Sequence, residues 1–224
     1  EIVRLTEPLG LLTYPNAYFI CYNGVLTIKT NPFEVLDQLC LHQEDVKSIV
    51  TSLGTKDVKY HVFCHNRLYI SDDITLTLEH HLSSETEVIR TDMSHYDHVD
   101  PLYKVLIYDE IEKVNHLKKA MPKDLLDRYS VVKSSDQLLE IFHKEGSKGH
   151  ALIKLVNHLS IDKQSVIAFG DEENDLSMLQ SAGLGIAMAN AKPAVLSAIK
   201  NRTLSNEFDG VANAINKYIL KGSD

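Results

Sequence analysis

Four acidic side chains fall within five positions of the chain, directly after a short apolar stretch. The stretch Val166–Phe169 has the composition of a buried strand, and the segment Gly170–Asp175 follows it at once. In an open α/β sheet, ligands bind just beyond the carboxyl ends of the strands, which is where Asp171 would lie. Carboxylates packed this densely repel one another unless a cation or a helix N-terminus offsets their charge. The segment therefore predicts a divalent-metal site.

An acidic first helical turn is the alternative interpretation of this segment. Acidic side chains near a helix N-terminus are stabilised by the helix dipole, which accounts well for Glu172 and Glu173. It does not explain why Gly170-Asp171 follows the strand directly, or why Asn174-Asp175 comes next. The metal site explains more of the pattern.

A lysine lies at the start of a second predicted helix. Ser147 is a good N-cap, and the apolar side chains that follow it at helical spacing are Ala151, Leu152, Leu155, Val156 and Leu159. Lys148 therefore falls in the first turn, where the helix dipole disfavours a cation. An anion bound there would interact favourably with the ammonium group and with free backbone N–H groups. A lysine that extends into solvent is the simpler explanation by itself, but the acidic cluster further along the chain favours a phosphate-binding Lys148.

A third candidate follows another short apolar stretch, Gly185–Met188. Asn190 comes after it and is placed to cap a helix over Lys192–Ile199. An asparagine at such a position is more often only a cap. Because Asn190 also follows the carboxyl end of a strand, it is a candidate for lining the same crevice as Asp171.

These segments together resemble the haloacid dehalogenase superfamily, and more narrowly its Cof-type sugar-phosphate phosphatases, which carry a large cap domain. The resemblance covers nearly the whole chain, and the segments that carry it are Asn23-Gly24, Lys148-Gly149, Gly170-Asp171-Glu172-Glu173-Asn174-Asp175 with Met178, Met188-Ala189-Asn190-Ala191 and Asp209-Gly210-Val211-Ala212. The Gly-Asp-x-x-Asn-Asp pattern together with the upstream Lys-Gly is specific, whereas each of the other segments is weak alone.

Alternating and amphipathic patterns predict the elements. In the middle region they are a hairpin over Lys59–Ile70, strands over Tyr103–Tyr108, Ser130–Lys133 and Leu138–Phe142, and helices over Gln43–Leu53, Ile74–Leu82 and Lys113–Asp127. From Ser147 onward, helices and strands alternate over Lys148–Leu159, Ser165–Phe169, Glu173–Ala182, Leu184–Met188, Lys192–Ile199 and Asp209–Leu220. Such alternation favours parallel β-α units with right-handed crossovers.

The change of pattern along the chain predicts a discontinuous core. Near the start of the chain we expect a helix end over Val3–Leu12 and a buried strand over Tyr18–Cys21, which would join the same parallel sheet. We therefore predict an α/β fold with a Rossmann-like core of residues 1–29 and 145–224, and an inserted α+β domain of residues 30–144. The resemblance implies that the insertion is a cap that covers the active site and selects the substrate.

The resemblance also implies a chemistry, the Mg²⁺-dependent hydrolysis of small phosphate monoesters, such as sugar phosphates, through an aspartyl-phosphate. Asp171 would ligate Mg²⁺, a hard cation that prefers carboxylate oxygens. Asp175 would ligate the metal or orient the site, Asn174 would contact the phosphoryl group or a metal-bound water, and Lys148 would offset charge on the phosphoryl oxygens. The other substrate-binding residues would be Asn190, Asn23 and Gly24.

One departure from the family pattern concerns the nucleophile. The family starts with a strand bearing Asp-x-Asp, whose first Asp is the nucleophile and whose second is an acid/base. Only 22 residues precede Asn23, and none of them reads Asp-x-Asp. We expect this segment to lie upstream of Glu1, and the 224 residues alone to have negligible turnover.

Two other functions remain open. A phosphomutase of similar architecture would need cap arginines for a second phosphate, and the middle region offers only Arg67, Arg90 and Arg128. A non-catalytic phospho-ligand sensor would be favoured if the coding sequence began near Glu1. Reading the DNA upstream of this segment would separate the sensor from the enzyme.

Composition limits the remaining classes of function. The formal net charge of -8 is spread along the chain, which argues against a nucleic-acid surface. No apolar run reaches the roughly 18–20 residues that a membrane helix needs, and no signal peptide is visible. The cysteines Cys21, Cys40 and Cys64 lack metal-ligand pairing and suit core positions in a reducing compartment, so we expect a cytoplasmic protein. The pattern indicates no oligomeric state.

Histidines are frequent in the middle region. His95-x-x-His98 has aspartates nearby, but no Cys or His partner pair lies at a zinc-like spacing. We therefore expect loop or solvent-facing histidines there, rather than a metal site.

Overall fold

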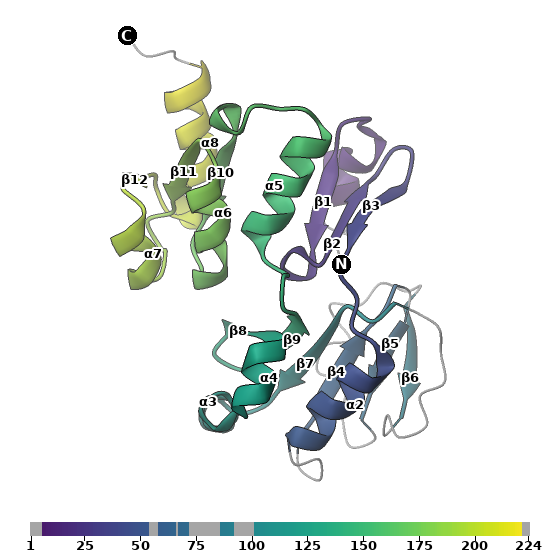
Figure 1. The fold of residues 1–224 in the computed structure, drawn as a ribbon. Helices are drawn as coiled ribbons and strands as arrows, with labels where there is room; N and C mark the ends of the chain where they lie inside the picture. Colours follow the sequence, from purple (N-terminus) through teal and green to yellow (C-terminus); the bar gives the residue numbers. More distant parts are fainter. Residues whose placement is uncertain (1–5, 54–57, 66, 72–85, 92–100, 221–224) are drawn as a thin grey trace. The chain divides into compact units, whose positions relative to one another are not determined.

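Figure 1 shows the fold in a computed structural model, which describes residues 6–53, 58–65, 67–71, 86–91 and 101–220. The chain consists of two compact units, Glu1–Gly146 and Ser147–Asp224. Both units combine helices with β-sheet, so the predicted α/β fold class is confirmed. The predicted domains, a core of residues 1–29 and 145–224 and an insertion of residues 30–144, stay a prediction.

The second unit consists of parallel β-α units. Its sheet has the order β10-β11-β12, and both strand pairs are parallel. The strands are β10 (Ile167–Gly170), β11 (Leu184–Ala187) and β12 (Asn201–Arg202), and the helices are α5 (Lys148–His158), α6 (Leu176–Ser181), α7 (Pro193–Ala198) and α8 (Gly210–Ile215). Short 3-10 turns span Lys163–Ser165, Glu173–Asp175 and Asn206–Phe208, and a π-helical turn at Asn216–Leu220 follows α8. The alternation predicted from Ser147 onward is therefore confirmed.

Close packing of α6 on the sheet places the acidic segment at one end of β10. A Cβ atom added at Gly185 in β11 would lie 2.1 Å from the carbonyl oxygen of Leu179 in α6, so only glycine fits there. One buried apolar cluster of this unit consists of Ala168, Leu179, Ala187, Ala191, Val195 and Ile199. Because β10 ends at Gly170 and α6 begins at Leu176, the acidic residues join the carboxyl end of the strand to the helix.

The first unit contains a six-stranded sheet with the order β6-β5-β4-β7-β9-β8. Its strands are β4 (Tyr60–Phe63), β5 (Arg67–Ile70), β6 (Glu87–Arg90), β7 (Lys104–Tyr108), β8 (Tyr129–Ser135) and β9 (Leu138–His143), and its helices are α2 (Gln43–Ser52), α3 (Ile111–Ala120) and α4 (Lys123–Arg128). Alternate residues of the strands, such as Val62, Val105 and Ile141, form one buried cluster with Ile49 of α2 and Val114 of α3. The predicted hairpin and the three predicted strands of this region are confirmed.

A separate three-stranded sheet opens the first unit. β1 (Tyr18–Cys21), β2 (Leu26–Lys29) and β3 (Glu34–Gln38) pair in that order, and both pairs are antiparallel. The expectation that Tyr18–Cys21 adds a strand to the parallel sheet is not met in the described pairing, because the chain reverses through Tyr22–Gly24 and pairs β1 with β2. So short a reversal can join only antiparallel strands, since parallel strands need a long crossover.

The helix predicted over Lys113–Asp127 is two helices. α3 ends at Ala120 and α4 begins at Lys123, with Pro122 between them. Proline lacks a backbone N–H and disfavours the helical conformation of the residue before it, and Met121 accordingly has an extended ψ of 123°. The proline therefore overrides the helical pattern on either side of it.

The helix end expected over Val3–Leu12 is two short 3-10 turns where the structure describes it. They span Glu7–Leu9 and Leu11–Thr13, and Gly10 between them has a φ of 67°, the left-handed conformation that ends a helix. The helix expected over Ile74–Leu82 and the histidines of His95-x-x-His98 lie outside the described residues. None of the described helices has the length and apolar character that crossing a membrane requires.

Candidate active site

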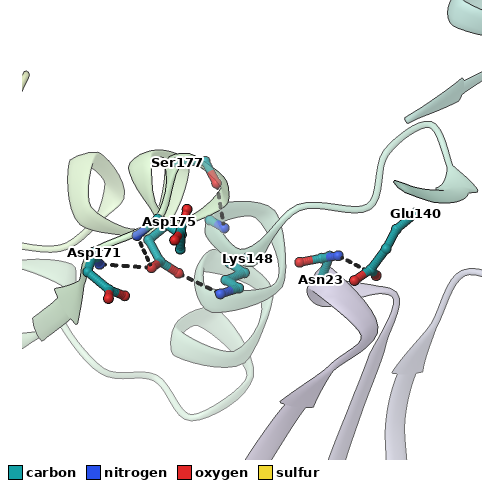
Figure 2. Close-up of polar contacts among 8 residues, drawn as sticks. Asn23, Glu140, Lys148, Asp171, Asp175 and Ser177 are labelled. Carbon is teal, nitrogen blue, oxygen red and sulfur yellow. Dashed lines mark hydrogen bonds and ion pairs between the residues drawn. The ribbon is translucent and has the colours of Figure 1, made fainter. Parts of the chain in front are cut away.

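The carboxylate of Asp175 organises the carboxyl end of β10 (Figure 2). Its Oδ1 atom lies 2.5 Å from the ammonium nitrogen of Lys148 at the start of α5. Its Oδ2 atom accepts hydrogen bonds from the backbone N–H groups of Asp171, at 3.0 Å, and Glu172, at 3.1 Å. The Asp175 side chain is only 7% exposed, so its charge is balanced inside the protein by the lysine and the two N–H dipoles.

Two glycines allow this close arrangement. A Cβ atom at Gly170 would lie 2.5 Å from the Cβ atom of Asp175, and one at Gly149 would lie 2.4 Å from the carbonyl oxygen of Ser177. Real Cβ atoms do not approach other atoms so closely. The Lys-Gly and Gly-Asp dipeptides therefore have a packing reason, because Gly149 lets α5 approach α6 and Gly170 lets β10 approach Asp175.

Two N–H groups in the first turn of α5 have protein acceptors. The N–H of His150 donates to Oγ of the N-cap Ser147, at 3.0 Å, and the N–H of Gly149 donates to Oγ of Ser177, at 3.1 Å. These two N–H groups are therefore not free for an external anion, whereas phosphate binding by Lys148 stays a prediction. In the structure, the anion at the ammonium group is the carboxylate of Asp175.

Asn190 connects the end of β11 to Asp171. Its Nδ2 group donates to Oδ2 of Asp171 at 2.9 Å, and its Oδ1 atom accepts from the N–H of Asn206 at 3.1 Å. The predicted capping role is wrong, because α7 has Lys192 as its N-cap residue and no side-chain capping bond. The N–H of Lys192 instead donates to the carbonyl oxygen of Asp171, at 2.8 Å. The expectation that Asn190 lines the same site as Asp171 matches this direct contact.

The carboxylates at the end of β10 are candidate ligands for Mg²⁺, which prefers oxygen ligands. Among the described residues, no group of three or more His, Cys, Asp and Glu side chains is arranged to hold a metal ion. Mg²⁺ does not need such a group, because it is usually held by one or two carboxylates, substrate phosphate and water. Asp171 is partly exposed, and in the described part of the chain its Oδ1 atom has no hydrogen-bond partner. The donor set therefore fits a magnesium ion held through Asp171.

The remaining predicted residues of the acidic segment lie in the same turn. Asn174 is half-buried within Glu173–Asp175, between the two aspartates. Glu173 is exposed, and Glu172 forms a loose ion pair with Lys192, at 3.8 Å. Within the acidic cluster, Asp171 and Asp175 are held by hydrogen bonds, Glu172 is half-buried, and Glu173 is exposed to solvent.

The predicted residues Asn23 and Gly24 belong to the first unit. Gly24 is buried, and the Nδ2 group of Asn23 donates to Oε2 of Glu140 in β9 at 2.9 Å. The same Oε2 atom lies 2.9 Å from the ammonium nitrogen of Lys104 in β7. A role of Asn23 and Gly24 in substrate binding stays a prediction.

Glu140, Lys104 and Ser177 form polar contacts but were not predicted from the sequence as site residues. Glu140 carried a signal, because it is the one acidic residue inside the apolar stretch Leu138–Phe142. Lys104 carried a similar signal within Tyr103–Tyr108. Ser177 carried none, because its partner Gly149 is 28 positions away and nothing in the local pattern marks the contact.

Comparison with other proteins adds evidence of relationship. A model of the haloacid dehalogenase-like hydrolases matches residues 2–215. The chain is 34% identical to "Putative phosphatase YxeH" of Bacillus subtilis (strain 168) over 225 residues, which cover 98% of this chain and 82% of that protein.

Two solved structures extend the comparison to the fold. A haloacid dehalogenase-like hydrolase from Bacteroides thetaiotaomicron has a TM-score of 0.82 and 27% identity, over 96% of this chain and 81% of that one. The HAD subclass IIB sugar phosphatase BT4131 has a TM-score of 0.75 over 96% of this chain and 79% of that one. Its identity is 17%, so this likeness shows the fold alone.

Proposed function

Because the chain belongs to the haloacid dehalogenase-like hydrolases, we propose that it is a Mg²⁺-dependent phosphatase for small phosphate monoesters, with sugar phosphates as the first class to test. The observation that carries the proposal is the contact between Lys148 and Asp175, which joins a cation at the start of α5 to the acidic segment after β10. Phosphoryl transfer depends mainly on positioning and charge neutralisation, and this arrangement supplies both.

Asp171 is the residue that would hold the metal. Its carboxylate lies at the carboxyl end of β10, and Asn190 fixes its orientation by a hydrogen bond to Oδ2. Bound Mg²⁺ would supply positive charge to offset the phosphoryl oxygens. Of the two roles expected for Asp175, the orienting one has more support, because both of its oxygens already accept contacts from Lys148 and the backbone.

The other site residues would act on the phosphoryl group. Lys148 is 31% exposed, so its ammonium group can offset charge on a phosphoryl oxygen while Asp175 holds it in place. Asn174, in the same turn as Asp175, would donate a hydrogen bond to the phosphoryl group or to a bound water. The residues that would complete the substrate contacts are Asn190, Asn23 and Gly24.

The attacking group would be the first aspartate of the Asp-x-Asp segment that the family resemblance implies. Its carboxylate oxygen would form a bond to phosphorus while the ester oxygen leaves and takes a proton from the second aspartate. Water would then cleave the aspartyl-phosphate and release inorganic phosphate. No Asp-x-Asp occurs among the 22 residues before Asn23, so this step is assigned to no residue of the printed sequence.

The test is release of phosphate from a panel of phosphate monoesters, with Mg²⁺ or with EDTA. We expect turnover that EDTA abolishes and Mg²⁺ restores. Asp171→Asn should lower kcat/KM by about a hundredfold or more, because it removes charge where the metal would bind. Binding of Mg²⁺ itself, followed by calorimetry without substrate, should weaken in the same variant.

Glu173→Gln is the matched control, because this glutamate is exposed in the same acidic segment. It should leave both turnover and Mg²⁺ binding close to those of the unaltered protein. Equal losses in the two variants would mean that general acidity matters and that Asp171 has no special role. Turnover that is insensitive to EDTA would contradict the proposed metal dependence.

The phosphomutase alternative has less support. Arg67 forms an ion pair with Glu87 at 2.8 Å, and Arg128 contacts Asp45 at 3.2 Å. Two of the three arginines in residues 30–144 therefore already have carboxylate partners, which leaves fewer arginines to bind a second phosphate.

A further inference from the structure

Three consecutive residues between β1 and β2 have left-handed backbone conformations. The φ angles are 50° at Tyr22, 58° at Asn23 and 94° at Gly24. Glycine adopts such angles freely and asparagine more readily than most residues, but Tyr22 costs roughly 1–2 kcal/mol in this conformation. A turn of this kind persists only where its surroundings hold it, and such turns concentrate at functional sites.

A buried ion pair holds the middle residue of this turn. One oxygen atom, Oε2 of Glu140, accepts from Nδ2 of Asn23 and from the ammonium group of Lys104, each at 2.9 Å. The side chains of Glu140 and Lys104 are 8% and 12% exposed. Burial of two charges is costly and adds little net stability compared with an apolar pair of similar volume. Stability alone therefore does not explain why these charges are here.

Aromatic rings hold the first residue of the turn. The Tyr22 ring stacks on Tyr103, with centroids 5.2 Å apart and planes 15° apart. The ammonium group of Lys104 lies 4.8 Å from the ring centroid of Phe63 and 5.4 Å from that of Tyr22. Lys104 therefore contacts Tyr22 directly and reaches Asn23 through Glu140, so the pair acts on two of the three residues of the turn.

We propose that Lys104 and Glu140 are positioning residues that keep the turn Tyr22–Gly24 left-handed, so that Asn23 contacts the phosphorylated substrate. The substrate part rests on the function proposed above for Asn23. Neither Lys104 nor Glu140 is required to touch the substrate. Their effect is transmitted through the amide of Asn23, whose Nδ2 group is fixed on Glu140.

The main test is the double variant with Lys104→Met and Glu140→Leu. Replacing both partners by apolar side chains of similar shape should leave the free energy of unfolding nearly unchanged, but it removes the acceptor for Asn23. Backbone amides of residues 22–25 should then exchange with deuterium at least tenfold faster. KM should rise about tenfold while kcat changes less than threefold, as expected for lost substrate positioning.

The transmission through Asn23 is tested by a double-mutant cycle. Asn23→Gly removes the amide and leaves a residue that accepts the left-handed conformation without strain. In that background Glu140→Met, which removes the acceptor oxygen, should have no further effect on KM, whereas in the unaltered background it should raise KM. Effects that simply multiply would show that Glu140 acts independently of the turn, and would overturn the proposal.

Glu87→Gln is the matched control, because it breaks an exposed ion pair with Arg67 in the same sheet. It should change neither the exchange of residues 22–25 nor KM. If the double variant does not fold, Glu140→Met alone, which also removes the acceptor, gives the same two readouts. Unchanged exchange in the turn of a folded variant overturns the proposal, whatever the activity.

The exchange measurement needs no substrate, so it separates this inference from the proposed function. If the unaltered protein hydrolyses no phosphate monoester, the proposed function fails. Faster deuterium exchange at the amides of residues 22–25 in the double variant would still support the inference that Lys104 and Glu140 stabilise the turn.

Discussion

At the scale of single residues, the most informative group is the carboxylate of Asp175. One oxygen holds Lys148 and the other holds two backbone N–H groups of the segment that carries Asp171. A carboxylate used in this way acts as a structural anchor for its neighbours. Its sequence position alone could not separate this role from that of a metal ligand, because both need an acid at the same place.

His61 in β4 gives a pH-dependent prediction for the first unit. It is 0% exposed, and among the described residues neither ring nitrogen has a hydrogen-bond partner. Burial lowers the pKa of His61 to about 4, whereas an unfolded histidine titrates near 6.5. Below pH 6.5 the unfolded state therefore binds more protons than the folded state. The contribution of His61 to stability is complete above pH 6.5 and is lost as the pH falls towards 4.

His61→Leu should reduce this acid sensitivity. The fall in the free energy of unfolding between pH 7 and pH 4 should shrink by up to about 3 kcal/mol, measured by urea denaturation at several pH values. His116→Gln, at an exposed position in α3, is the control and should keep the original pH profile. Identical profiles for His61→Leu and the unaltered protein would show that His61 is protonated at the same pH in both states.

At the scale of elements, the contact between α5 and α6 depends on one glycine. Gly149→Ala would place a Cβ atom 2.4 Å from the backbone of Ser177, where no flexible side chain can move aside. The helices would have to separate, and the bond from the Gly149 N–H to Ser177 would lengthen. We expect a loss of roughly 2–3 kcal/mol in the stability of the second unit, comparable to overpacking of a core.

Gly10→Ala is a suitable control for this prediction. Gly10 has open space around it, so an added Cβ there meets only the Thr13 side chain at 4.0 Å, although its φ of 67° adds some strain. The loss from Gly149→Ala should be larger, and it should be accompanied by a shift of the Lys148 contact. A loss no greater than that of Gly10→Ala in chemical denaturation would mean that α5 moves freely relative to α6.

Helices and strands with a clear hydrophobic periodicity could be predicted from the sequence. Elements whose pairing depends on residues distant in the sequence could not. The helices and strands after Ser147 follow local periodicity, so the parallel units were predicted correctly. Pro122 is a local signal too, but the apolar stripe across it suggested one helix where two exist. The pairing of β1 with β2 depends on the turn at Tyr22–Gly24, and the Asn23-Gly24 dipeptide, a local hairpin signal, was interpreted only as part of the family resemblance.

The candidate site shows the same division. Lys148, Asp171, Asp175 and Asn190 were recognised from residue type and position, and the structure joins them by direct contacts within the second unit. The closeness of Asn190 to Asp171 was expected from their strand ends, but their hydrogen bond and the bond between Gly149 and Ser177 could not be predicted, because each depends on how two segments approach in space.

At the scale of the whole molecule, each unit has a core of its own. Val195 is fully buried in the core of the second unit, which shares no residue with the two clusters of the first unit. Val195→Ala should therefore destabilise the second unit by about 1–3 kcal/mol through the cavity that it leaves. Hydrogen exchange should become faster in β10 and β11.

The strands of the six-stranded sheet provide the comparison for that experiment. Their amides should keep their exchange rates in Val195→Ala, because local openings follow the packing of each cooperative unit. Uniformly faster exchange in both units would instead show that the chain unfolds as one body. The membership in the haloacid dehalogenase-like hydrolases gives the fold of both units a shared ancestry with other phosphatases, but it does not fix how their stabilities are coupled.

The two bonds of Asn190 have a consequence for the ageing of the protein. Its amide has a carboxylate on one end and an N–H group on the other, so it can adopt only one of its two orientations. Spontaneous deamidation would convert the Asn190 amide into a carboxylate, so that a negatively charged oxygen would replace the N–H donor beside Asp171. The mass of the protein would be almost unchanged, but two carboxylates would then repel each other at the carboxyl ends of β10 and β11.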